Sequence, residues 1–131
     1  MSIRREFARF AVVGGVGFAV EALTLHALVS EFAWSPFAAR AVSFPAAVTT
    51  TYALNRAWTF RERGDAGGFA AYGVYGGIQA VGALINLAVF AACLLAVRPL
   101  AERPVIALAI GAAAAMLFNF LASRLLVFRR Q

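Results

Sequence analysis

Four long apolar blocks run through the sequence, and they constrain the fold more than any other feature. They extend from about Phe10 to Ser30, from about Phe37 to Trp58, from Phe69 or Tyr72 to Val97, and from about Pro104 to Phe128. A helix of about 20 apolar residues crosses the roughly 30 Å hydrocarbon core of a bilayer. Each block is long enough, so we expect an all-α integral membrane protein with four transmembrane helices.

The composition argues against a soluble protein. Hydrophobic residues make up 63% of the 131 residues and charged residues only 14%, against about 45–50% and about 25% in soluble domains. A small soluble domain has too much surface to cover with so few charges. The net charge of +6 therefore does not indicate a soluble nucleic-acid-binding protein. The sequence has no nucleotide-binding loop, nucleophile elbow or metal-ligand spacing, so we expect no enzymatic activity, cofactor or metal ion.

Four prolines indicate where the helices begin, end or bend. Pro36, Pro99 and Pro104 lie near block boundaries, where a missing backbone N–H is tolerated. Pro45 lies inside the second block and predicts a kink, which neighbouring hydroxyls can accommodate.

The distribution of arginine predicts the orientation. All twelve basic residues are arginines. Nine flank one side of the four blocks: Arg4, Arg5, Arg9, Arg56, Arg61, Arg63, Arg124, Arg129 and Arg130. Only Arg40, Arg98 and Arg103 flank the other side. Basic loops stay in the cytoplasm, so both termini are expected there. The first block has a basic front, as signal peptides do, but Glu21 interrupts it and three further blocks follow, so we expect it to be retained.

The sequence contains an internal repeat. Residues 55–61 (NRAWTFR) and 123–129 (SRLLVFR) share Arg, Phe and Arg at a shift of 68, and residues 7–15 match residues 69–77 at a shift of 62. We predict a single domain, 1–131, built from two-helix repeats at about 7–61 and 69–129. Repeats with an even number of spans are parallel, and a site is expected at their interface. The alternative is that Arg and Phe are generic interfacial anchors.

Each block also carries one face of small and polar residues at helical spacing. These faces comprise Gly14, Gly17, Glu21 and Thr24; Arg40, Ser43, Ala47 and Thr50; Gln79, Gly82, Ala83 and Asn86; and Gly111, Ala115, Asn119 and Ala122. Charged groups inside a membrane are costly and usually face a partner or water. We therefore expect a bundle with a hydrophilic interior, which a simple lipid anchor would not need.

Several motifs resemble those of the GtrA-like family of small four-span membrane proteins. They are Phe10 with Val13-Gly14-Gly15, Glu21, Arg40-Ala41-Val42-Ser43, Tyr52-x-x-Asn55-Arg56-x-Trp58-x-Phe60, and Asn119-Phe120-x-x-x-Arg124-x-x-Val127-Phe128. The resemblance extends over nearly the whole chain. It implies flippase-type translocation of a polyprenyl-phosphate-linked monosaccharide across the bacterial cytoplasmic membrane, for cell-surface polysaccharide or glycan synthesis.

Such a lipid has an anionic phosphate and a head group rich in hydroxyls. Arg56 and Arg124 are expected to make the first phosphate contact at the cytoplasmic helix ends, because a guanidinium binds phosphate oxygens bidentately. Arg40 would receive the phosphate toward the outer side. Glu21, Asn86 and Asn119 are expected to line the path of the head group. The alternatives are that Arg56 and Arg124 only anchor helices, and that Arg40 snorkels outward or pairs with Glu21.

Two other functions remain open at this stage. A non-transporting subunit that recruits or stabilises a membrane glycosyltransferase would also need a polar interface. A proton-coupled multidrug exporter also has four spans and a first-helix glutamate, but its dual insertion requires balanced loop charge, which the arginine bias opposes. Four short helices enclose little volume, so a homodimer is also expected.

Overall fold

The computed structural model describes residues 1–64 and 67–129, without the side chains of residues 101, 104 and 105. Within these residues it contains helices and no strand. The α-helices are α1 (Ile3–Ser30), α2 (Pro36–Leu54), α3 (Gly68–Ala96), the short α4 (Arg98–Ala101) and α5 (Pro104–Ala122). The predicted all-α class is thus confirmed, and each apolar block forms one long helix.

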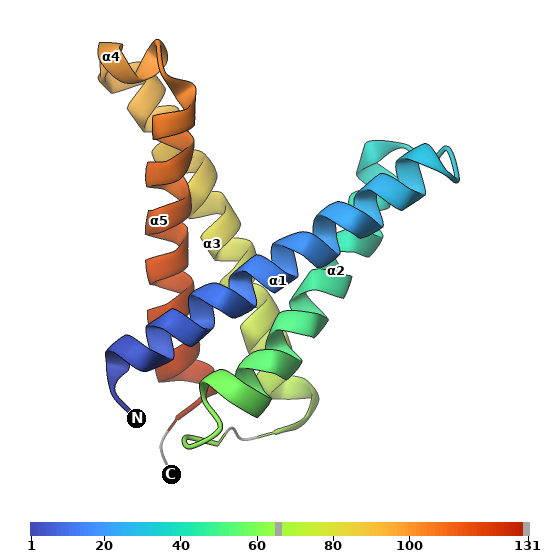
Figure 1. Ribbon diagram of the computed structural model, residues 1–131, viewed down its shortest axis with the longest axis vertical. Coiled ribbons are helices and arrows are strands. Elements are labelled where there is room, and N and C mark those ends of the chain that lie inside the picture. Colours follow the sequence, from blue (N-terminus) through green and yellow to red (C-terminus); the bar gives the residue numbers. More distant parts are fainter. Residues whose placement is uncertain (65–66, 130–131) are drawn as a thin grey trace.

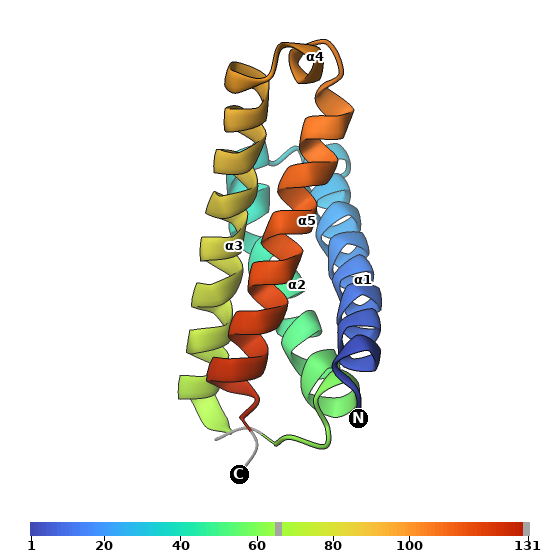
Figure 2. The ribbon, with the colours of Figure 1, turned by 90° about the vertical axis from the view of Figure 1, so that its left-hand side faces the viewer.

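The long helices form two hairpins. Helix α1 packs along α2, and α3 packs along α5. Figure 1 shows that the hairpins meet at the end where α1 begins, which we call the closed end, and diverge toward the opposite, open end. Figure 2 shows the long helices from the side, running in the same general direction. Side-chain caps help to start α1 and α2: the hydroxyl oxygens of Ser2 and Ser35 accept hydrogen bonds from the backbone N–H groups of Arg5 and Ala38.

Both hairpins finish in a π-helix at the closed end. The first, η1 (Asn55–Thr59), continues α2, and the second, η2 (Ser123–Val127), continues α5. The backbone N–H of Phe60 donates to the carbonyl of Asn55 at 2.8 Å, and that of Phe128 donates to the carbonyl of Ser123 at 2.9 Å. Wider turns of this kind are rare and occur often at functional sites. They fall on the two segments that share the repeated sequence motif.

A cluster of aromatic side chains fills the space between the hairpins at the closed end. The rings of Phe60 and Phe128 stack with centroids 4.7 Å apart and an interplanar angle of 19°. The ring centroids of Phe10 and Phe120 lie 6.1 Å and 6.0 Å from that of Phe60, and 5.6 Å from each other. All four side chains are buried. We call Phe10, Phe60, Phe120 and Phe128 the aromatic cluster.

In the part of the chain that the structure describes, three helical segments are long and apolar enough to cross a membrane: Ile3–Ser30, Gly68–Ala96 and Ile106–Val127. Most of their side chains are not buried within the chain, which suits contact with lipid. Helix α2 is not among them, since Arg40, Pro45 and the threonines at 49–51 make it less apolar. The fourth span therefore stays a prediction.

The threonines of α2 bond mainly to their own helix. Helix α2 continues through Pro45. The hydroxyls of Thr49 and Thr50 donate to the carbonyls of Pro45 and Ala46, each at 2.8 Å, and that of Thr51 donates to the carbonyl of Val48 at 3.1 Å. These hydroxyls therefore bond backbone carbonyls next to the proline, as expected from the sequence.

Candidate functional site

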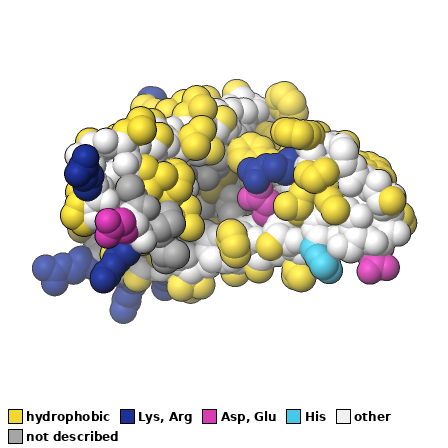
Figure 3. Space-filling view, turned by 90° about the horizontal axis from the view of Figure 1, so that it is seen from above, with side chains coloured by type: hydrophobic (Ala, Val, Ile, Leu, Met, Phe, Trp, Pro, Cys, Tyr) yellow, Lys and Arg dark blue, Asp and Glu magenta, His cyan; other side chains and the backbone are white. Residues whose placement is uncertain are grey.

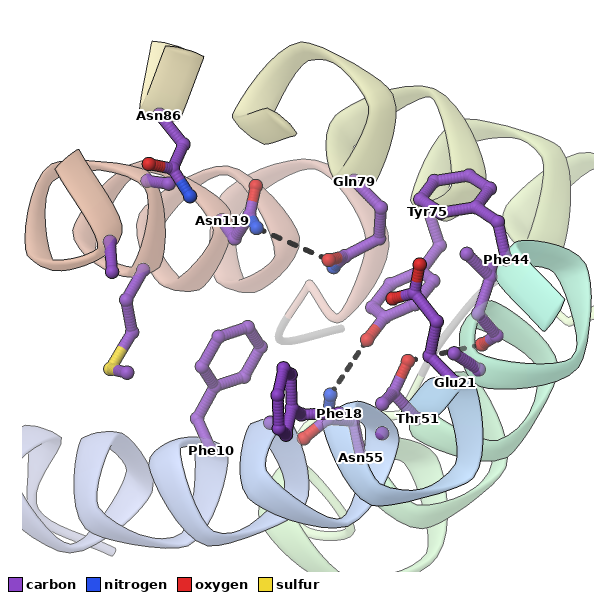
Figure 4. A pocket seen from close by; sticks show the side chains of 17 residues that line it. Phe10, Phe18, Glu21, Phe44, Thr51, Asn55, Tyr75, Gln79, Asn86 and Asn119 are labelled. Atoms are coloured by element: carbon purple, nitrogen blue, oxygen red, sulfur yellow. Dashed lines mark hydrogen bonds between the residues drawn. The ribbon is translucent and has the colours of Figure 1, made fainter. Parts of the chain in front are cut away.

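A cavity of about 310 Å³ lies between the two hairpins and is lined by all four long helices. Figure 4 shows its side chains converging from both hairpins. Its polar lining consists of Glu21, Thr51, Asn55, Tyr75, Gln79, Asn86 and Asn119. Glu21 is the one charged residue in this lining. The cavity thus combines apolar walls with a few converging polar groups, which is typical of a small-molecule site.

The floor of the cavity is a buried hydrogen-bonded chain. The side-chain amide of Asn55 donates to the Tyr75 hydroxyl at 2.9 Å, and the Thr59 hydroxyl donates to Asn55 Oδ1 at 2.7 Å. All three side chains are buried. Because each group has its partner, the chain holds η1 against α3. The aromatic cluster lies toward the closed end and blocks that side.

At the rim of the cavity, Glu21 forms an ion pair with Arg40. Arg40 Nη2 lies 3.1 Å from Glu21 Oε1, and the two side chains are 60% and 24% exposed, respectively. The pair is close enough for Coulombic attraction, but its geometry is not that of a hydrogen bond, and Glu21 Oε1 has no hydrogen-bond partner. Figure 3 shows the open end hollowed between the hairpins, with a basic side chain against an acidic one at the edge of the hollow.

Amide side chains line the part of the cavity formed by α3 and α5. The Asn119 amide nitrogen donates to Gln79 Oε1 at 3.1 Å, while the buried Asn119 Oδ1 has no hydrogen-bond partner. Glycines make room for these amides. A Cβ atom at Gly82 would overlap the Asn119 side chain, and one at Gly111 would lie 2.6 Å from Asn86 Oδ1. Glycine at these two positions therefore lets the helices approach closely without displacing the amides.

A charged cluster lies at the closed end, outside the cavity lining. Glu6, whose side chain is 2% exposed, accepts hydrogen bonds from Arg63 Nε at 2.7 Å and Arg124 Nε at 2.6 Å. Each carboxylate oxygen thus has one guanidinium partner. Charge-assisted hydrogen bonds of this length are among the strong ones. We call Glu6, Arg63 and Arg124 the Glu6 cluster.

The structure brings together some of the sequence-predicted site residues and separates others. Glu21, Asn86 and Asn119 line the cavity, and Glu21 lies there with Gly14 and Gly17, as the helical spacing predicts. Arg40 lies at the rim, paired with Glu21. Arg56 and Arg124 lie in η1 and η2, outside the cavity lining, and Arg124 binds Glu6.

Sequence reasoning missed the Glu6 cluster. Its partners are 57 and 118 residues away from Glu6 along the chain, so no local spacing relates them. The available signal was an acidic residue beside a run of arginines at the start of a helix, and Arg63 was counted only for orientation. Tyr75 was also missed, because nothing local pairs it with Asn55.

The cavity offers carboxylate and amide oxygens as acceptors together with amide donors, a set that suits a ligand rich in hydroxyls. Among the described residues, no group of three or more metal-ligating side chains comes together. The sequence model of one family, described as GtrA/DPMS, transmembrane domain, matches residues 9–128. Comparisons with curated proteins and with solved structures gave no match.

Proposed function

Because the chain belongs to the GtrA/DPMS transmembrane-domain family, we propose that it translocates a polyprenyl-phosphate-linked monosaccharide across the bacterial cytoplasmic membrane. The lipid would supply cell-surface polysaccharide or glycan synthesis on the outer side. The observation that carries this proposal is the polar cavity between the hairpins, with Glu21 and four amide side chains in an otherwise apolar bundle. A scaffold alone does not need a polar cavity inside a membrane.

The proposed topology has four spans and both termini in the cytoplasm. Helix α2 is the fourth span, packed against α1, and it carries more polar residues than the others. The two hairpins would be parallel repeats, and the matching positions of η1 and η2 support this. In this orientation the closed end faces the cytoplasm and the open end faces outward.

Each part of the lipid has a place in this arrangement. The sugar would occupy the cavity, where carboxylate and amide groups bond its hydroxyls. The phosphate would bind the Arg40 guanidinium at the rim, in exchange for Glu21. The long apolar tail would leave sideways between the diverging hairpins (Figure 1).

Alternating access would require the closed end to open. In this structure the aromatic cluster and the Glu6 cluster occupy the route from the cavity to that end. Arg56 and Arg124 are placed at the ends of the two hairpins, where they would meet an arriving phosphate. We therefore propose that loading from the cytoplasm separates Phe60 from Phe128, with no catalytic step and with energy drawn from a lipid or ion gradient.

The test is translocation in reconstituted vesicles that contain a polyprenyl-phosphate hexose. A membrane-impermeant reagent for sugar diols should consume only the outer-leaflet lipid in empty vesicles, and inner-leaflet lipid as well when the protein is present. Glu21→Gln keeps size and hydrogen-bonding capacity but removes the charge, so it should insert and fold while translocation falls strongly. The matched control is Glu31→Gln, the same change at an exposed residue outside the cavity lining.

The competing proposal is a non-transporting subunit that stabilises a membrane glycosyltransferase. It predicts no translocation by the purified protein and normal glycan synthesis in cells that carry Glu21→Gln. Unchanged translocation by Glu21→Gln would exclude the transport role that we assign to this carboxylate. The same vesicles, examined by crosslinking, would also report whether the protein works as a homodimer.

A further inference from the structure

We propose that Glu21 makes the cavity selective for an uncharged or amino-bearing monosaccharide and excludes an anionic head group such as a uronic acid. This inference rests on the proposed function and specifies the substrate of the same cavity. It follows from the charge of the cavity lining, from its unpaired hydrogen-bonding groups and from the position of Arg40.

The charge of the cavity lining is negative. Of the 17 lining residues, Glu21 carries the one formal charge, and none is a lysine or an arginine. A carboxylate on the bound sugar would meet Glu21 without a cation inside the cavity. Like charges brought together away from water repel each other strongly, because little solvent screens them.

The buried side-chain atoms of the cavity lining that accept no hydrogen bond are both acceptors: Glu21 Oε1 and Asn119 Oδ1. Glu21 Oε1 is the atom that faces Arg40 Nη2 in the ion pair at the rim. Figure 4 shows the two side chains on opposite hairpins around the same space. Sugar hydroxyls and ammonium groups can donate to both oxygens, whereas an ionised carboxylate has no hydrogen to donate. An acceptor left unpaired by the wrong ligand is costly, so the pattern favours a donor-rich head group.

Arg40 does not remove this selectivity. Its side chain is 60% exposed, lies at the rim and is not part of the cavity lining. The lipid phosphate is the stronger competitor for its guanidinium, since phosphate is present in every substrate of this kind and binds bidentately. Once the phosphate occupies Arg40, Glu21 faces the sugar without its counter-charge.

The size of the cavity fits one sugar. Its volume of about 310 Å³ lies at the small end of the range of small-molecule sites. A single pyranose ring with its hydroxyls fits into this space. The phosphate and the tail must then stay outside, at the rim and between the hairpins.

A matched pair of lipids tests the selectivity. Polyprenyl-phosphate glucose and polyprenyl-phosphate glucuronic acid differ only at C6, where a hydroxymethyl group is replaced by a carboxylate. In vesicles at neutral pH, the wild-type protein should translocate the glucosyl lipid at least about tenfold faster than the glucuronosyl lipid. The corresponding glucosamine lipid should move at least as fast as the glucosyl lipid.

Three variants test whether Glu21 is the residue responsible for the preference for the glucosyl lipid. Glu21→Gln should reduce the glucosyl-to-glucuronosyl ratio toward one, whatever its absolute rate, while Glu31→Gln should leave the ratio unchanged. Asn119→Asp adds a second negative charge to the cavity and should increase the ratio. If Glu21→Gln fails to fold, the Asn119→Asp variant alone tests the charge selectivity. An unchanged glucosyl-to-glucuronosyl ratio in that variant overturns the inference.

The outcomes separate this inference from the proposed function. Equal wild-type rates for the two lipids would overturn the selectivity and leave translocation intact. If the wild type moves neither lipid, the proposed function fails. The selectivity is then tested by competition between the glucosyl and glucuronosyl lipids for binding to the detergent-solubilised protein. Preference for the glucosyl lipid in that assay supports it, and equal affinities overturn it.

Discussion

Arg124 Nε lies 2.6 Å from Glu6 Oε2, and this contact joins η2, of which Arg124 is the second residue, to the first turn of α1. The other oxygen of Glu6 accepts from Arg63, just beyond η1. One carboxylate thereby links three separate parts of the closed end. Its neighbour in the chain, Phe7, packs edge to face against Phe120 of the aromatic cluster, with ring centroids 5.2 Å apart. We infer that Glu6 stabilises the closed end in the state seen here.

The first prediction concerns the Glu6→Gln variant. The substitution leaves two guanidiniums facing a neutral amide in a site where Glu6 is 2% exposed and Arg63 is 7% exposed. Removing one partner of a buried ion pair typically costs about 3–5 kcal/mol, and the partial exposure of Arg124 favours the lower value. Thermal unfolding of the purified protein in detergent should therefore occur at a clearly lower temperature.

The control for this prediction is Glu62→Gln. Glu62 accepts a hydrogen bond from the N-terminal ammonium but is half exposed, so water can replace that contact. We expect almost no change in its unfolding temperature. A Glu6→Gln protein as stable as this control would show that the Glu6 cluster contributes nothing to the closed end.

The second prediction distinguishes the two π-helix arginines. Arg124 uses its Nε atom to bind Glu6, an atom that lysine lacks, so Arg124→Lys should lower the unfolding temperature. Arg56 is exposed, so water screens its contacts, and Arg56→Lys should change stability less than Arg124→Lys. It should weaken binding of a polyprenyl-phosphate sugar, because lysine loses the bidentate contact with phosphate. Unfolding in detergent and lipid binding should be measured on both variants.

Unchanged lipid binding by Arg56→Lys would return that residue to the role of a helix anchor. Equal stability of the two variants would argue that the Arg124 contact with Glu6 is not specific to the guanidinium.

The helices and the cavity-facing residues could be predicted because they follow local rules. Apolar length predicted each helix to within a few residues at most boundaries, although α1 begins earlier, at Ile3. Spacing by three or four residues placed Glu21 and Gly17 on one face, and both line the cavity. The helix was extended at its start because Ser2 caps it and the arginines there are good helix formers.

Contacts between distant segments could not be predicted in the same way. The π-helices depend on one extra residue in a turn, and the pattern of residues 55–61 predicts only a helix end there. The contact of Arg124 with Glu6 could not be predicted, because the two residues lie 118 positions apart in the chain. A charge count treats all arginines near a helix end alike, whereas packing decides which of them meets a carboxylate.

The third prediction concerns the close approach of α3 and α5. An alanine Cβ at Gly111 would lie 2.6 Å from Asn86 Oδ1 and 2.8 Å from the backbone carbonyl oxygen of Asn86. The backbone cannot move aside easily, so Gly111→Ala should destabilise the protein by roughly 1–3 kcal/mol. Gly77→Ala is the matched control, since nothing lies within 4 Å of its added Cβ. It should be neutral or slightly stabilising in the same detergent unfolding assay.

If Gly111→Ala proved as stable as Gly77→Ala, the close packing of these two helices would be disproved. The variant also affects the cavity, because a displaced Asn86 changes its lining. We therefore expect lower sugar-lipid binding along with the lower stability.

The last prediction tests the orientation and the fourth span together. Accessibility reporters at Met1 and Gly64 should both lie in the cytoplasm. Reporters at Leu100 and at Ala33, which lies between α1 and α2, should both lie outside. The nine arginines on one side hold the protein in a single orientation. A reporter at Ala33 that remains cytoplasmic would show that α2 does not cross the membrane. Reporters found on both sides at every position would indicate dual insertion, and would favour a proton-coupled exporter over a flippase.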